Sequence, residues 1–222
     1  EHGRYIEKIR HFLECPAQIC QEENAEPVRG EFQELSLRNV SFSYPQGGQV
    51  LKEVNLTIRR GERIALVGYN GAGKSTLVKL LMRLYDVTSG EIARNGTDIR
   101  RLNLREYRGQ YAALFQDYQV FAATLGENIV MDRVPVDEEK MEPLLRRSGF
   151  DRKFAELPRG YGTPLTGEFE EDGVTFSGGE AQMVGICRSL YQDSQIVVLD
   201  EPSSALDPLS EYNLNHTMMN LD

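Results

Sequence analysis

The sequence predicts an α/β fold with three parts: a core built on a mostly parallel sheet, an antiparallel β subdomain and a helical subdomain. Three observations predict it. A glycine-rich loop over 68–75 lies between an apolar run and a helical pattern. A second apolar run, 196–199, ends in two carboxylates, and alternating polar and apolar residues cover 32–58. Continuous apolar runs are typical of buried parallel strands, whereas alternation is typical of antiparallel strands with one wet face.

The bulk composition limits the possible partners. The 222 residues are 40% hydrophobic and 27% charged, with a net charge of −9, as in ordinary globular proteins. We expect no nucleic-acid partner, because binding DNA or RNA usually needs a basic face. The three cysteines lack metal-ligand spacing and fit a reducing compartment. No apolar run is long enough to cross a bilayer, and a start at Glu-His-Gly leads us to expect a piece of a longer polypeptide.

The first sixty residues predict a helix, a linker and a sheet. Apolar residues share one face over 4–14, and Pro16 ends that pattern. A polar linker follows over 21–30. The helix is either a terminal element docked on the core or a connector from an upstream domain. Alternation over 32–58, with a turn at 45–48, predicts an antiparallel sheet.

The middle of the chain predicts the core and the helical subdomain. The run 64–67 predicts a buried strand, and the helix after the loop has apolar residues at Leu77, Leu80, Leu81 and Leu84. Residues 91–93 lead to the hairpin turn Asn95-Gly96. A buried strand is expected over 111–116, helices over 124–160 with a break at Pro135, and a solvated acidic loop over 161–176.

The loop over 68–75 carries the pattern G-x-x-x-x-G-K-[ST], which binds polyphosphates. Its glycines allow backbone N–H groups to surround phosphates. Lys74 would reach the β- and γ-phosphates, and the Ser75 hydroxyl would face Mg²⁺. The positive N-terminal end of the next helix would point at the same anion.

The two acidic residues that follow the apolar run 196–199 are candidates for binding the metal and for general base catalysis. Ligands in open α/β sheets bind beyond the carboxyl ends of the strands, so Asp200 and Glu201 should emerge beside the phosphate loop. We expect Asp200 to hold Mg²⁺, directly or through water, and Glu201 to activate the attacking water as a general base.

Residues 177–180, Ser-Gly-Gly-Glu, have two interpretations. The spacing S-x-x-E is a capping box that would start a helix running to about Tyr191. A serine hydroxyl and two glycines at a helix N-terminus could also bind an anion. The motif alone favours the cap, and its place between the other two motifs favours an anion site as well.

The order of these motifs resembles the nucleotide-binding domain of ATP-binding cassette (ABC) proteins, from Phe32 to the end. Residues 196–201 look like Walker B, 176–180 like the signature, and 204–207 like the D-loop. The resemblance implies ATP and Mg²⁺ as ligands. It implies that Gln116 contacts Mg²⁺ and the attacking water, and that Lys74 and Glu201 are catalytic. The nucleotide-binding residues that it implies are Tyr44 (stacked on adenine), Gly68, Asn70, Gly71, Ala72, Gly73, Lys74, Ser75, Thr76, Ser177, Gly179 and Asp207.

Two segments resemble the exporter branch: 120–129, and the X-loop 166–168, which in the family touches the membrane domain. The resemblance implies a connector over 1–24 and an ATPase domain over 25–222, with its helical subdomain at about 118–178. It implies a transmembrane domain of the same or a partner polypeptide, a second ABC ATPase domain as dimer partner, and a place on the cytoplasmic face of the cell membrane. ATP-driven dimerisation would then power export.

The chain departs from the family pattern at three points. Glu180 replaces the usual Gln and Phe176 the usual Leu. The switch histidine is absent, because the chain stops at Asp222 before that strand, so we expect the domain to lack its C-terminal end. Glu180 and the missing histidine leave open an ATP-binding module with weak hydrolysis. A separate alternative is a soluble ABC ATPase not linked to transport.

Overall fold

The computed structural model divides into two compact units, Glu1–Arg108 and Gly109–Asp222. It describes residues 7, 9–10, 13–14, 19–115, 118–132, 135–168, 172–200 and 211–212. The helix predicted over 4–14 therefore lies largely outside the described residues. In the described part no helix has both the length and the apolar character needed to cross a bilayer.

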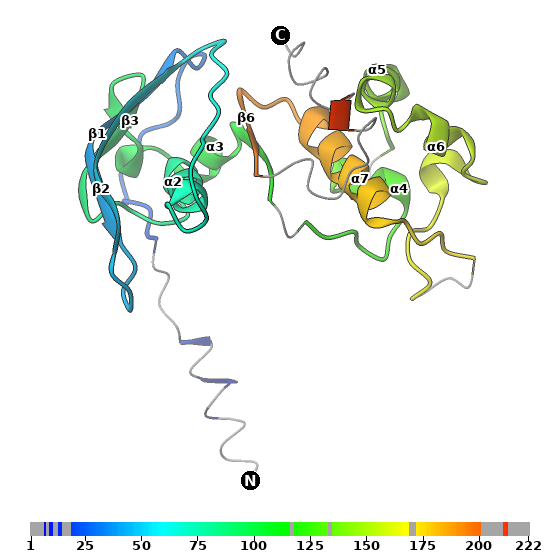
Figure 1. Cartoon of the computed structure of the whole chain (residues 1–222), viewed down its shortest axis with the longest axis horizontal. Helices are drawn as coiled ribbons and strands as arrows, with labels where there is room; N and C mark the ends of the chain where they lie inside the picture. The colour runs from blue at the N-terminus through cyan, green and yellow to red at the C-terminus, as the bar shows by residue number, and fades with distance from the viewer. Residues whose placement is uncertain are drawn as a thin grey trace. The chain divides into compact units, whose positions relative to one another are not determined.

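The first unit is built on a four-stranded antiparallel sheet with strand order β2-β1-β3-β4 (Figure 1). The strands are β1 (Glu34–Ser43), β2 (Gln49–Arg59), β3 (Ser89–Arg94) and β4 (Thr97–Asp98). The prediction over 32–58 is confirmed. The apolar side chains that form the core on β1 are Leu35, Leu37, Val40 and Phe42.

Local turn chemistry sets both hairpins of this sheet. The β1–β2 turn closes with a 3.1 Å hydrogen bond from the Gly47 N–H to the Tyr44 carbonyl. At the β3–β4 turn, Asn95 and Gly96 have φ values of 48° and 81°. Positive φ at both central residues is the geometry of a type I′ turn, whose twist matches that of the strands. The predicted Asn95-Gly96 hairpin is confirmed.

Helix α2 (Lys74–Leu81) follows the glycine-rich loop as predicted, and buries Leu77, Leu80 and Leu81. Two short elements complete this unit, the 3₁₀ helix η1 (Ile99–Arg101) and helix α3 (Leu104–Arg108). The tyrosine of α3, Tyr107, is fully buried and donates a hydrogen bond to the Leu81 carbonyl. The end of α2 is thereby joined to α3.

The strand predicted over 64–67 is wrong for this structure. These residues have no strand pairing, and Val67 is 92% exposed. A strand forms where a neighbouring strand pairs with its main-chain N–H and C=O groups, and the four-stranded sheet of this unit does not include the run.

Two buried arginines fasten the predicted linker to the first unit. Arg83, 2% exposed, donates to the carbonyls of Cys20 and Ile99. Arg94, 3% exposed, donates to the carbonyls of Arg29 and Gly30. These four hydrogen bonds end on main-chain oxygens, and Nε of Arg83 also donates to Oδ1 of Asp86 at 3.1 Å. The linker is therefore docked along residues 20–30.

In the second unit a short parallel sheet lies to one side of a group of helices (Figure 1). Strand β5 (Tyr111–Leu114) pairs in parallel with β6 (Ile196–Leu199), the one parallel pair among the described residues. The helices are α4 (Leu125–Val130), α5 (Glu138–Ser148), α6 (Asp151–Ala155), η2 (Gly160–Gly162) and α7 (Gly178–Tyr191). The helices predicted over 124–160 and the break at Pro135 are confirmed. Leu144, Leu145, Phe150 and Leu157 are buried in the core of this unit, and Phe154 packs against it partly buried.

Helix α7 packs against β5, α4 and α5. Gly185 permits the approach to β5, because a Cβ added there would lie 2.6 Å from Cδ1 of Leu114. The expectation that 196–199 is buried on both faces is wrong here, since Val197 is 39% exposed. Among the described residues β6 has one neighbouring strand, β5, and burial of an apolar run depends on such neighbours.

Gly90 lies at an irregularity in the pairing of β1 with β3. Its φ is +84°, and an added Cβ would lie 2.4 Å from the Asn39 carbonyl oxygen and 2.6 Å from that of Arg38. The β1–β3 register shifts between Arg38 and Ser41 at the same place. Only glycine fits a bulge that combines positive φ with close backbone approach.

We predict that Gly90→Ala lowers the free energy of unfolding by roughly 2–5 kcal/mol, from positive φ together with overpacking. Gly96→Ala is the matched control, because Gly96 also has positive φ (+81°) but no atom within 4 Å of its would-be Cβ. It should cost about 1 kcal/mol. Urea unfolding followed by circular dichroism measures both, and equal losses would contradict the clash at Gly90.

Candidate nucleotide site and partner-facing pocket

The phosphate loop enters helix α2 through two glycines in the left-handed region, Gly71 at φ 83° and Gly73 at φ 92°. At Gly73 an added Cβ would also lie 2.8 Å from Cδ2 of Leu51 on β2. Glycine is therefore required at the first position before the helix. The residues of the loop over 68–71, which include Gly68 and Asn70, are exposed, so its main chain can be approached by an anion.

Lys74 is turned back onto its own loop. Its Nζ donates to the Gly68 carbonyl at 2.8 Å and to the Tyr69 carbonyl at 3.2 Å. An ammonium group held by neutral carbonyls can exchange them for phosphate oxygens, which form stronger charge-assisted hydrogen bonds. Ala72 stabilises the loop through its N–H, which donates to the Tyr69 carbonyl at 3.1 Å. The loop therefore fits a polyphosphate.

Tyr44 and Thr76 link the sheet to the phosphate-binding helix. The Tyr44 hydroxyl lies 3.2 Å from Oγ1 of the buried Thr76. The Tyr44 ring packs edge to face on Phe42 (4.9 Å between centroids) and Tyr85 (5.3 Å). The resemblance to ABC proteins pointed to Tyr44, but the sequence analysis missed Tyr85, which has no motif and follows the end of α2. The aromatic position predicted for adenine is thus held beside the first turn of α2.

The predicted metal and catalytic residues are only partly described. Ser75 lies in the first turn of α2. Asp200 directly follows β6 in the second unit, and its N–H donates to the Leu114 carbonyl at 2.9 Å. Gln116, Glu201 and Asp207 lie outside the described residues. Among the described residues no three His, Cys, Asp or Glu side chains gather as a metal site. Magnesium binding through Ser75 and Asp200 stays a prediction.

The Ser-Gly-Gly-Glu motif starts helix α7 with a complete capping box. The Ser177 Oγ accepts from the Glu180 N–H at 3.3 Å, and the Ser177 N–H donates to Oε2 of Glu180 at 2.8 Å. The cap prediction is confirmed, and α7 ends at Tyr191 as expected. The Ser177 side chain also hydrogen-bonds the Glu180 carboxylate, so an anion would compete with Glu180 for the Ser177 hydroxyl. The first N–H groups of a helix have no partner within it, and they favour an anion at the same end of α7.

Glu180 is also paired with Lys153 on α6. The distance between Oε1 of Glu180 and Nζ of Lys153 is 3.0 Å. Burial raises the pKa of the Glu180 carboxyl, but hydrogen bonds from the Ser177 backbone and from Lys153 lower it by more, to below its ordinary value. The hydrogen bond to Glu180 raises the pKa of Lys153. The motif gave no signal for this partner, because it lies 27 residues earlier in the chain.

Two aromatic residues support the motif from either side. Phe176, which stands where the family usually has Leu, packs edge to face on the buried Phe150 at 5.7 Å. Tyr118 donates from its hydroxyl to the Gly178 carbonyl at 2.7 Å. The departure at Phe176 therefore supplies core packing. Sequence analysis missed Tyr118, because a single tyrosine in a loop carries no pattern.

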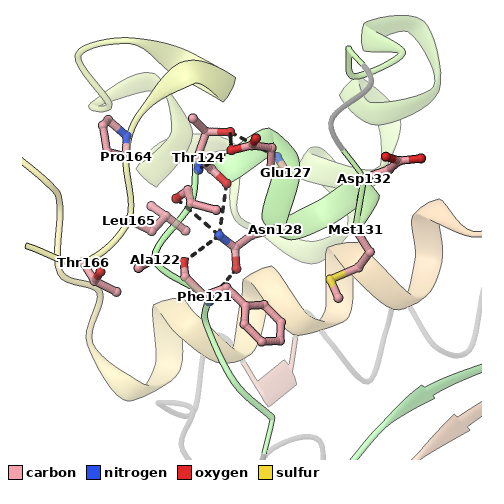
Figure 2. Close-up of a pocket in the computed structure, with 11 residues that line it drawn as sticks. Phe121, Ala122, Thr124, Glu127, Asn128, Met131, Asp132, Pro164, Leu165 and Thr166 are labelled. Carbon is pink, nitrogen blue, oxygen red and sulfur yellow. Dashed lines mark hydrogen bonds between the residues drawn. The ribbon is translucent and has the colours of Figure 1, made fainter. Parts of the chain in front are cut away.

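A pocket of about 450 Å³ opens between α4 and the loop at 164–166 (Figure 2). It brings together two segments that resemble exporters, 120–129 and the start of the X-loop. Phe121 and Met131 are about half exposed, and Thr166 has a positive φ of 68°. The residues that line it are Phe121, Ala122, Ala123, Thr124, Glu127, Asn128, Met131, Asp132, Pro164, Leu165 and Thr166.

Asn128 shapes this pocket from within α4. It is 1% exposed, donates to the carbonyls of Phe121 and Thr124 at 3.0 Å, and accepts from the Phe121 N–H at 2.8 Å (Figure 2). Arg188 of α7 donates to the Asn128 and Gln119 carbonyls at 2.8 and 3.0 Å. The wall of the pocket is thus bonded to the helix that the Ser-Gly-Gly-Glu motif opens.

A phosphate loop opening one helix, and a capped Ser-Gly-Gly motif opening another, define a nucleotide-binding protein of the P-loop class. A family model described as "ABC transporter" matches residues 51–204. The chain belongs to the ABC transporter family. It is an ATP-binding domain of the kind that ABC transporters use as their ATPase.

Known relatives agree with this assignment. The chain is 36% identical over 220 residues to the subtilin transport ATP-binding protein SpaT of Bacillus subtilis. It is 42% identical over 179 residues to ATP-binding cassette sub-family B member 5 of Mus musculus. A solved structure of a bacterial Atm1-family ABC exporter with ATP bound superposes with a TM-score of 0.86 at 29% identity.

The chain spans only part of each of these relatives. The matches cover 98% of the chain but 36% of SpaT, 80% of the chain but 14% of the mouse protein, and 97% of the chain but 37% of the exporter structure.

We predict that Tyr44→Ala weakens Mg-ATP binding by about 1–3 kcal/mol, the usual worth of base–aromatic stacking. Tyr44→Phe should bind nearly as well as the unchanged protein, because stacking uses the ring and not the hydroxyl. Calorimetric titration with ATP and with inorganic tripolyphosphate measures both. Tripolyphosphate has no base, so its affinity should not change, and a parallel loss of both ligands would contradict stacking.

Proposed function

We propose that this chain hydrolyses ATP to power export across a membrane, as the ATPase domain of an ABC exporter on the cytoplasmic face of the cell membrane. The observation that carries the proposal is the pocket in which segments 121–132 and 164–166 form one surface. The first segment holds most of the exporter-like stretch 120–129, and the second ends on Thr166, the first residue of the X-loop. The names of the relatives, which include ATP-binding/permease proteins, support the same assignment.

Each residue has a defined part in the proposed reaction. Lys74 exchanges its bonds to the Gly68 and Tyr69 carbonyls for the β- and γ-phosphates of ATP. Ser75, Gln116 and Asp200 hold Mg²⁺, which would neutralise charge on the phosphate oxygens. Glu201 removes a proton from the attacking water.

A second ABC ATPase domain completes the proposed site. In this arrangement Ser177 and Gly179 of one domain, together with Asp207, face the nucleotide held by the phosphate loop of the other. Charge on the γ-phosphate joins the two halves, and hydrolysis releases them. The positive N-terminal end of α7 favours that contact electrostatically.

The transmembrane partner is proposed to insert a short helix into the pocket beside α4. The exposed parts of Phe121 and Met131 favour apolar side chains of that helix. Motion of α7 would reach the pocket through the bonds of Arg188 to Asn128 and Gln119. The proposed partner contact and the proposed nucleotide contact thus share one helix.

We predict that Glu201→Gln, introduced in the complete polypeptide that carries this chain, traps an ATP-bound dimer and lowers turnover by about 10²–10⁴-fold through loss of the general base. Size exclusion in saturating Mg-ATP and a phosphate-release assay measure the two effects. Glu211→Gln, at an exposed helical glutamate, is the matched control. A monomeric Glu201→Gln variant beside an active unchanged protein would argue against the assignment.

We predict that Met131→Asp disrupts the contact with the membrane partner. Facing an apolar helix, a carboxylate costs more than about 1.4 kcal/mol, so hydrogen exchange at 121–124 and 164–166 in the complete polypeptide should quicken by about tenfold or more. Met131→Leu should keep the original rates. Because Met131 lies outside the phosphate loop, ATP affinity should stay constant, and unchanged exchange in Met131→Asp would count against docking here.

A further inference from the structure

Glu180 brings a negative charge to the position where the family usually has a neutral Gln. The residue lies in the first turn of α7, three residues after Ser177. The proposed function places a triphosphate of the second domain at this same helix end. An unpaired carboxylate there would repel that anion, because like charges in a partly desolvated site are weakly screened.

Both oxygens of the carboxylate are, however, engaged within this chain. Oε2 accepts the Ser177 N–H at 2.8 Å, and Oε1 lies 3.0 Å from the Lys153 ammonium. Lys153 also lies 3.5 Å from Glu156, so α6 orients the ammonium with a carboxylate of its own. The Lys153 and Glu180 side chains are 30% and 31% exposed, which places the pair partly out of water.

A charge count shows what the lysine contributes. A helix N-terminus carries about +0.5 of an elementary charge. Glu180 contributes −1, which would leave about −0.5 at the end of α7. Lys153 adds +1 and restores about +0.5, the value that the helix would have with a neutral residue at its third position. Glu156 also faces Lys153 at 3.5 Å, but its side chain is 70% exposed against 31% for Glu180, so water screens its charge more strongly. The opposed pKa shifts of the two groups agree with a pair that stays ionised.

We propose that Lys153 is a positioning residue of the second nucleotide site, which neutralises Glu180 and holds its carboxylate on the Ser177 N–H. The Ser177 hydroxyl and the N–H groups of Gly178 and Gly179 then face the γ-phosphate of ATP bound by the other domain. This inference rests on the proposed function, since it assigns a role within that composite site.

The test uses four forms of the complete polypeptide: unchanged, Lys153→Met, Glu180→Gln and the double variant. Lys153→Met should raise the KM for Mg-ATP by roughly two- to fivefold, the scale of a partly exposed ion pair, with little change in kcat. The increase should shrink as salt rises from 50 to 500 mM, because screening weakens repulsion. Lys153→Arg should behave as the unchanged protein.

Glu180→Gln decides between an electrostatic and a merely structural role. Without the carboxylate there is no charge to neutralise, so Lys153→Met should have no effect in the Glu180→Gln background. Equal KM values for Lys153→Met and the unchanged protein would overturn the inference. So would an increase that Glu180→Gln does not remove, or that salt does not reduce.

The outcomes also separate this inference from the proposed function. If the unchanged protein neither dimerises with Mg-ATP nor hydrolyses it, both fail together. If it does both and Lys153→Met is indistinguishable from it, the inference alone fails. A thermal melt of each variant checks folding, and the Glu180→Gln rescue keeps the test valid even if Lys153→Met melts a few degrees lower.

Discussion

One close approach, between the backbone of Gly73 and the side chain of Leu51, fixes where helix α2 begins. A φ of 92° and a distance of 2.8 Å from an added Cβ to Leu51 leave room for glycine alone. The first turn of the helix then holds Lys74 against the loop and Thr76 against Tyr44. The position at which α2 begins also orients the N–H groups of its first turn. The phosphate loop and Tyr44 are therefore held in place relative to each other before a nucleotide binds.

Helix α7 has the corresponding role in the second unit. Its N-terminus is capped by Ser177, its middle lies on β5 at Gly185, and its last turn bonds the pocket through Arg188. Rigid secondary-structure elements can couple two sites when they have two discrete positions. A displacement of the Ser177 end of α7 would in that case reach the segment that Asn128 holds. Because Glu180 is paired with Lys153, its charge alone is no argument for a module that binds ATP without hydrolysing it.

Structural features that depend on residues close together in the sequence were predicted correctly. Features that depend on residues far apart in the sequence were not. The Asn95-Gly96 turn and the Ser177 capping box are set by residues a few positions apart, so their spacing was sufficient. An apolar run does not specify which strands will lie beside it. For this reason the strand expected over 64–67 and the expected burial of Val197 were both wrong. The pairing of Lys153 with Glu180 joins two helices, and neither periodicity nor spacing encodes it. The order of the motifs was enough to predict a nucleotide as the ligand. The side chains that contact each motif could be identified only from the structure.

The docked linker has a consequence for how such a chain can vary. Arg83 and Arg94 grip it through the main-chain oxygens of Cys20, Arg29 and Gly30. Carbonyl groups are common to all amino acids, so the contacts of the two arginines do not depend on the side chains of Cys20 and Arg29. Three other linker positions do contribute, because Oε1 of Gln21 accepts the Leu104 N–H, Glu26 pairs with Arg101, and Gly30 has a φ of +68°. Sequence change in the linker should therefore be better tolerated at Cys20 and Arg29 than at these three positions.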